Sequence, residues 1–191
     1  MSEATYQREH AVRTFIAELS QATHEFKDGD GDRAPNYVLL PSGGQANRVM
    51  IAGTVTNIED AAENDDTTFW RANVNDGTDE MSVFAGQYQP DAQSKLRELH
   101  EEDSIPPAYL MVVGKPDVYE DDEDGAIVSI KAEQLRVIDG DERAIWISQA
   151  LRHTKRRFDE QHDGLSPETI YNNPTAWFDD ELLESLAESL A

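Results

Sequence analysis

The sequence predicts a mostly β protein with flanking helices: a five-stranded Greek-key barrel with N-terminal and C-terminal helical extensions. From Tyr37 to Ile138 the chain consists of short, alternating, β-branched runs separated by turn signals, with one helical segment among them. On both sides of this region, apolar residues recur at the three- and four-residue spacing of helices. We therefore divide the chain into an N-terminal helix and linker (1–35), a barrel domain (36–140) and a C-terminal helical extension with an acidic tail (141–191).

A helix is predicted from about Glu3 to Thr23, because most of the apolar residues in this segment fall at helical spacing. The acidic, glycine-containing run 28–32 then ends the pattern. This run superficially resembles the start of a calcium-binding loop, but Arg33 stands where such a loop needs glycine and Leu39 where it needs a bidentate glutamate. We expect a turn or a flexible link here, without calcium.

The elements of the barrel region follow one another in a restrictive order. After a short lead-in, we expect three strands, a short helix that begins at a proline, and two further strands: 37–40, then 48–58, 69–74, 80–85, helix 90–99, 109–114 and 126–138. On the first of these strands, Val49, Ile51, Gly53, Val55 and Asn57 are predicted to share one face. A generic small sandwich also alternates strands, but a single helix between the third and fourth strands is the order of the OB-fold.

The C-terminal extension is predicted to be helical from Asp141 to Gln161 and again from Asp179 to Leu190. The first helix carries the only dense basic cluster of the sequence: Arg152, Lys155, Arg156 and Arg157. Such a cluster is able to steer phosphates, but on a helix it more often forms a solvated face balanced by acidic neighbours. These helices either pack on the barrel or bind a partner.

Acidic residues outnumber basic ones by 39 to 16, which gives a net charge of -23. The acid is spread over the whole chain, as in proteins dissolved in multimolar salt, where repulsion is screened within about 3 Å at 1 M. A dedicated acidic interaction surface, or mimicry of DNA, is the alternative that this scatter disfavours. In such salt the net charge does not exclude DNA, because binding then depends on stacking and hydrogen bonds.

Composition also disfavours several functional classes. The absence of cysteine excludes disulfides, thiolate catalysis and cysteine-ligated zinc. The histidines are dispersed and no phosphate-binding glycine loop is present, so we expect no enzymatic activity, no cofactor and no metal site. No apolar signal segment or stretch of roughly 18 apolar residues occurs, which predicts a cytoplasmic protein without a membrane partner.

Candidate nucleic-acid-binding residues follow from strand alternation. OB-folds bind oligonucleotides across the second and third strands and under the loops between strands one and two and four and five. Trp70, Ala72 and Val74 are all apolar and are expected to face the core. The opposite face then carries aromatic rings for base stacking, an arginine for phosphate or cation–π contacts, and two polar groups. These residues are Phe69, Arg71, Asn73, Ser82 and Phe84.

Two alternatives remain open for this face. A terminal helix that covers the aromatic residues would give them a purely structural role. A register shift of one residue would exchange the two faces and expose Trp70 instead. Tyr119, at the mouth of the loop between the fourth and fifth strands, is a secondary candidate together with Lys115, and Arg48 at the start of the first strand completes the set.

The sequence resembles the haloarchaeal replication protein A-associated proteins between about Arg8 and Asp159. The resemblance depends on the ordered combination of four runs: Asn47 to Thr54, Phe69 to Ala72, Phe84 to Pro90, and Pro107 to Pro116. It implies a single OB domain that assembles with a larger replication protein A subunit into a hetero-oligomer acting on single-stranded DNA in replication and repair. It does not identify the residues that touch DNA, and it does not extend to residues 167–191.

The sequence therefore leaves two functional hypotheses. Exposed Phe69, Arg71 and Phe84 favour a subunit of a single-stranded DNA-binding complex. The apolar stripes of the helical flanks favour a protein-interaction scaffold that stabilises a DNA-binding partner without binding DNA itself.

Overall fold

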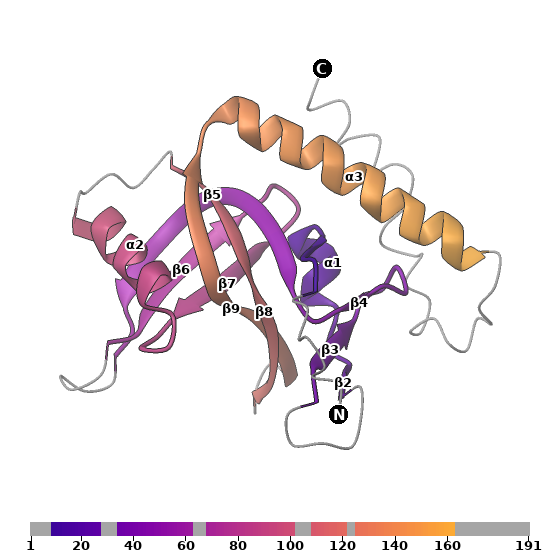
Figure 1. Ribbon diagram of the computed structural model, residues 1–191, viewed down its shortest axis with the longest axis horizontal. Coiled ribbons are helices and arrows are strands. Elements are labelled where there is room, and N and C mark those ends of the chain that lie inside the picture. The colour runs from indigo at the N-terminus through magenta and orange to yellow at the C-terminus, as the bar shows by residue number, and fades with distance from the viewer. Residues whose placement is uncertain (1–8, 28–33, 63–67, 102–107, 122–124, 163–191) are drawn as a thin grey trace, which may run out of the picture.

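The computed structural model describes residues 9–27, 34–62, 68–101, 108–121 and 125–162, with side chains described up to Arg157. The calcium-like run 28–32, the expected helix at 179–190 and most of the tail lie outside these ranges. The elements, labelled in Figure 1, are β1 (Val12–Arg13), α1 (Ile16–Ser20), β2 (Glu25–Lys27), β3 (Asn36–Leu39), β4 (Gln45–Ala46), β5 (Val49–Asp60), β6 (Trp70–Asn75), β7 (Glu80–Ala85), α2 (Pro90–Glu101), β8 (Tyr109–Asp121), β9 (Gly125–Ile138) and α3 (Gly140–His162).

The described residues form two sheets, and the larger one closes on itself. Its strands are hydrogen-bonded in the order β1-β5-β6-β7-β9-β8, and a further pairing joins β8 back to β5. The β7–β9 pairing is parallel, whereas β5–β6, β6–β7, β8–β9 and β5–β8 are antiparallel. Strands β5 to β9 therefore form a ring in which each has a neighbour on both sides. The second, small sheet consists of β2, β3 and β4.

The mostly β class is confirmed, and the main elements lie close to their predicted positions. Strands β5, β6, β7 and β9 and helix α2 begin and end within a residue or two of the predicted segments. Strand β8 is longer than predicted and continues to Asp121, where a loop was expected. Helix α3 covers the predicted segment 141–161. The division of the chain into three parts stays a prediction.

One prediction on β5 is wrong because the strand contains a bulge. Val55 pairs with Val74 but Asn57 pairs with Asn73, so Thr56 is an extra residue on β5. The bulge reverses the alternation, so Ile58 is buried and Asn57 is exposed, and Asn57 does not share the face of Val49, Ile51 and Val55 as predicted. Gly53 is required on this strand because a Cβ at this position would overlap the backbone of Asn75.

The predicted N-terminal helix is mostly wrong. Among the described residues from 9 to 23, only Ile16–Ser20 are helical, and residues 3–8 lie outside the described part. Val12 and Arg13 instead pair in parallel with Val49 and Met50 of β5. The helical spacing of apolar residues is satisfied by burial of Phe15, Ile16 and Leu19 in the common core, so long-range pairing overrides the local pattern.

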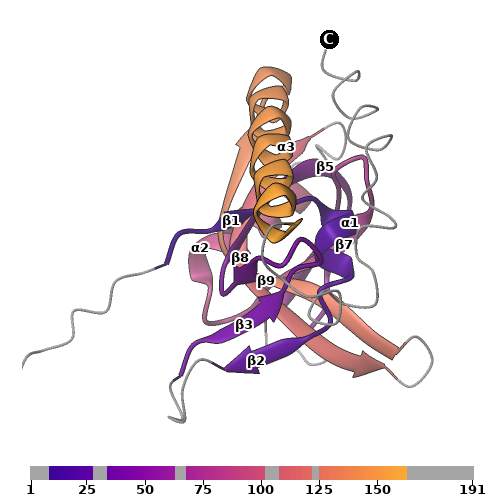
Figure 2. The same cartoon turned by 90° about the vertical axis from the view of Figure 1, so that its right-hand side faces the viewer.

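A single apolar core joins the closed sheet to all three helices. Helix α2 buries Leu96 and Leu99, and α3 buries Trp146 and Ile147. The Trp146 ring packs in a T-shaped arrangement against the ring of Phe15, the residue before α1, at a centroid distance of 5.6 Å. Figure 1 and Figure 2 show α2 and α3 on different sides of the closed sheet. No helix in the described ranges is long and apolar enough to cross a membrane.

A buried ion pair fastens α3 to the N-terminal segment. Glu18 of α1 is fully buried, and its Oε2 accepts hydrogen bonds from Arg157 Nη2 at 2.6 Å and from Thr14 Oγ1 at 2.7 Å. Arg157 also donates from Nε to Ser42 Oγ at 2.7 Å and from Nη1 to the Arg13 carbonyl at 3.1 Å. Arg157 therefore differs from the solvated basic face expected at the end of this helix.

Asp76 organises the turn between β6 and β7. Its buried carboxylate accepts hydrogen bonds from the backbone N–H groups of Ile16 at 2.8 Å and Thr78 at 2.9 Å, and from Thr78 Oγ1 at 2.6 Å. Burial raises the pKa of the Asp76 carboxyl above its ordinary value, although these hydrogen bonds act against the shift. One side chain thus holds both the turn and the first residue of α1.

We expect Asp76→Asn to lower the free energy of unfolding by about 1–3 kcal/mol, because an amide N–H₂ would replace one acceptor oxygen and leave a buried donor unsatisfied. The folded-state pKa of Asp76 lies above its unfolded value, so the native state binds more protons between the two, and wild type loses stability as pH rises through this window. The difference in free energy of unfolding between wild type and Asp76→Asn should therefore become smaller as the pH rises through this window. Urea unfolding of both proteins below and above the window measures this, and a constant difference would contradict it.

Candidate nucleic-acid interface

The outward face of β6 and β7 carries the predicted residues in the predicted register. Trp70, Ala72 and Val74 are buried, and Trp70 is only 6% exposed. The alternative register, in which Trp70 would face solvent, is therefore wrong. Arg71 pairs directly with Phe84, and Asn73 with Ser82, so side chains of both strands project from the same side of the sheet.

Two phenylalanines form a preassembled aromatic platform on this face. Phe69, just before β6, and Phe84 on β7 are stacked with ring centroids 5.3 Å apart and planes inclined by 14°. Gly86 lies beneath the first ring, since a Cβ there would stand 3.1 Å from Phe69 Cδ2. Phe69 remains 38% exposed. Because the two rings already stack on each other, the pair is preorganised to take part in stacking with a base.

Cations extend from this platform across the neighbouring strands. Phe84 pairs with Arg71 of β6 on one side and with Lys131 of β9 on the other, and Lys131 pairs in turn with Lys115 of β8. We call these four residues the cross-strand row. Lys131 was not among the predicted site residues, because its position beside Phe84 depends on the parallel β7–β9 pairing that closes the sheet. In the sequence, only the alternation along β9 indicated that the side chain of Lys131 faces outward.

Two of the three cations in the cross-strand row are paired with carboxylates. Arg71 forms an ion pair with Glu59, its direct partner on β5, and Lys131 Nζ lies 2.7 Å from Asp117 Oδ1. Lys115 is exposed and has no ion-pair partner among the residues that the structure describes. The row therefore presents cations whose charge is largely balanced within the face.

The polar residues beside the platform are hydrogen-bonded to one another. Ser82 Oγ donates to Asn73 Oδ1 at 3.2 Å, and Asn73 Nδ2 donates to Glu80 Oε1 at 3.3 Å. The second oxygen of Glu80 accepts from Thr56 Oγ1 at 2.7 Å. Asn73 and Ser82 are thus brought to the face as predicted, but contact with a base edge would require them to exchange these partners.

The remaining predicted residues are divided between two locations. Tyr119 is 42% exposed and stands four residues beyond Lys115 on β8, so both side chains share the outer face of a strand rather than a loop. Arg48 is buried and forms an ion pair with Glu133, at the end of β5 that does not pair with β6. The prediction that Arg48 belongs to the site is wrong, because this buried arginine links the start of β5 to Glu133 of β9.

Other chemistry is not concentrated on this face. Among the described residues, no group of three histidine or acidic side chains is placed to hold a metal ion. Burial raises the pKa of Asp76 and lowers that of His153, but these residues lie in the β6–β7 turn and on α3. The arrangement therefore offers stacking and charge contacts along an extended, solvent-facing surface.

The fold is shared with a chain of known structure. The chain aligns with a chain of a replication protein A heterotrimer bound to single-stranded DNA at a TM-score of 0.51 and 16% identity, covering 78% of this chain and 98% of that chain. The chain therefore has a mostly β, OB-type fold. A weaker similarity, to a chain in a structure of yeast Stn1 and Ten1, has a TM-score of 0.44 and 14% identity. It covers 84% of this chain and 80% of that chain. The sequence matches no protein-family model and no curated protein.

Proposed function

We propose that this protein is a non-enzymatic OB-fold subunit of a single-stranded DNA-binding complex. The observation that carries the proposal is the stacked Phe69–Phe84 platform on the outer face of β6 and β7, continued by the cross-strand row. Stacked aromatic rings accept every base, and cations beside them meet the phosphates, which is the chemistry of binding without sequence preference. The replication protein A-type fold supports the same conclusion.

The partner subunit, the cellular location and the process are proposed from the sequence. The resemblance to haloarchaeal replication protein A-associated proteins supports assembly with a larger replication protein A subunit in the cytoplasm, in DNA replication and repair. The net charge of -23 supports function at high salt, where the self-repulsion of the chain is screened. The closed ring of β5 to β9, with α2 packed against it, would then be the OB-fold barrel of that subunit.

Fluorescence anisotropy of labelled oligo-dT with the purified protein tests this function, in KCl of about 2–3 M, where short-range screening suppresses self-repulsion. We expect wild type to bind and Arg71→Ala to bind a few-fold more weakly, since an exposed cation–π or phosphate contact contributes about 0.5–1 kcal/mol. Arg97→Ala removes an exposed arginine from α2 and should leave binding unchanged. Absence of binding by wild type would refute direct DNA binding.

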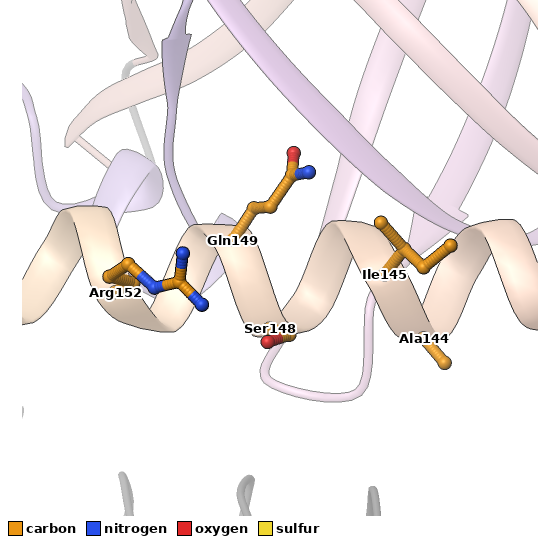
Figure 3. A pocket seen from close by; sticks show the side chains of 5 residues that line it. All are labelled: Ala144, Ile145, Ser148, Gln149 and Arg152. Atoms are coloured by element: carbon orange, nitrogen blue, oxygen red, sulfur yellow. The ribbon is translucent and has the colours of Figure 1, made fainter.

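A second function is supported by one observation on α3. Ile145 is 59% exposed and contributes to an open surface hollow of about 430 Å³, lined also by Ala144, Ser148, Gln149 and Arg152, as Figure 3 shows. An exposed apolar side chain beside a hollow suits contact with another protein. If wild type does not bind oligo-dT, the protein would serve as the scaffold that supports a DNA-binding partner through this helix.

A further inference from the structure

We propose that Glu59 and Asp117 act as built-in counterions of the DNA-binding face, so that DNA affinity depends only weakly on salt concentration. This inference rests on the proposed function and concerns how the same face is regulated. While DNA is absent, each carboxylate forms an ion pair with one cation of the cross-strand row. Binding of single-stranded DNA then becomes an exchange, in which a phosphate replaces the carboxylate and the freed carboxylate takes up K⁺ from solution.

The two ion pairs lie on opposite sides of Phe84 along the row. Glu59 is the β5 neighbour of Arg71, which adjoins Phe84 on one side, and Asp117 holds Lys131, which adjoins Phe84 on the other. A strand of DNA that stacks on the platform therefore meets a cation already paired with a carboxylate in either direction.

Both ion pairs are exposed enough to exchange partners. The side chains of Arg71 and Glu59 are 39% and 41% exposed, and those of Lys131 and Asp117 are 57% and 35% exposed. Pairs in such surroundings gain little from remaining together, so a phosphate competes with the carboxylate on nearly equal terms. By contrast, Arg48 in the Arg48–Glu133 pair is only 7% exposed, so that pair has less freedom to exchange partners.

The consequence for salt dependence follows from ion counting. A single-stranded DNA that meets Z free cations loses affinity with a slope of about -0.7Z in log K against log salt, because condensed counterions are released. When the cation already has a carboxylate partner, the K⁺ released from the phosphate is offset by K⁺ taken up by that carboxylate. Only Lys115 would then contribute to the slope, and the face would keep binding in concentrated KCl.

Measurement of oligo-dT affinity across a KCl series tests the inference with the full chain. For wild type we expect a slope of about -0.7, and for Glu59→Gln with Asp117→Asn a slope of about -2, since three free cations would then release counterions. Over a fourfold increase in KCl, affinity should fall about threefold for wild type and about 20-fold for the double variant. At the low end of the series the double variant should bind more tightly than wild type.

The matched control is Glu98→Gln with Glu101→Gln, which changes the net charge by the same amount on exposed positions of α2. Its slope should equal that of wild type, and circular dichroism at each KCl concentration verifies that all variants remain folded. A wild-type slope near -2, or equal slopes for wild type and the Glu59→Gln, Asp117→Asn variant (the face variant), would overturn the inference while leaving DNA binding intact. Failure of both wild type and the face variant to bind DNA would overturn the proposed function together with this inference.

Discussion

Replacement of Phe84 by Ala is expected to weaken oligo-dT binding by roughly 10- to 100-fold, within the range of about 1–3 kcal/mol that one aromatic–base stack contributes. The effect should lie in the upper part of that range, because Phe84 also supports the ring of Phe69 at a centroid distance of 5.3 Å. Its loss would leave Phe69 in contact with Gly86 but without its stacking partner. The variant therefore removes a platform rather than a single contact.

Anisotropy titration in concentrated KCl measures this loss, and two variants separate stacking from other causes. Phe84→Leu keeps an apolar side chain of similar size on β7 but has no aromatic face, so it should bind nearly as weakly as Phe84→Ala. Tyr88→Ala removes an aromatic ring that is 83% exposed between β7 and α2 and should bind like wild type. Unchanged affinity of Phe84→Ala would place the DNA elsewhere on the molecule.

Arg157→Ala is expected to lower the free energy of unfolding by about 3–5 kcal/mol, the usual result of removing one partner of a buried ion pair. Glu18 is fully buried, and without the guanidinium its carboxylate would keep only the hydroxyl groups of Thr14 and Thr154 as donors. The carbonyl of Arg13 and the hydroxyl of Ser42 would lose a partner as well. Several segments that meet at α3 are weakened by this one change.

Urea unfolding followed by tryptophan fluorescence measures this effect, since Trp146 of α3 is buried against Phe15 near α1. Arg152→Ala, at an exposed position of the same helix, controls for the loss of one positive charge and should change stability by less than about 0.5 kcal/mol. Glu18→Met combined with Arg157→Met should recover much of the loss, because replacing both members of a buried pair with apolar side chains is often close to neutral. A change below about 1 kcal/mol for Arg157→Ala would mean that the ion pair does not hold the helix.

Much of the β framework could be read from local pattern. Alternation along 69–74 and 80–85 correctly separated the buried side of Trp70 from the outward side that carries Arg71 and Phe84. The proline at the start of α2 and Gly77, whose φ is 101°, lie at boundaries that depend on a few adjacent residues. These features were predictable because each is decided by the chemistry of neighbouring positions.

The errors arose where residues distant in sequence decide the outcome. Val12 is drawn into a strand by β5, and the extra residue Thr56 reverses the alternation of that strand. Arg48, predicted to meet DNA, instead neutralises Glu133, which lies 85 residues away. In the first two cases, strand pairing with a distant segment overrides local propensity, which differs among ordinary residues by less than about 1 kcal/mol.

For the candidate site, the residue types and their alternation were sufficient to propose an aromatic face with Phe69, Arg71 and Phe84. Only sheet closure places Lys131 beside Phe84, and only the folded chain shows that Arg71 and Lys131 already hold carboxylates. Strand periodicity is a property of adjacent peptide units and is visible along the chain. Contacts across a closed sheet depend on register and packing over many residues, so they appear only when the whole ring of strands is formed.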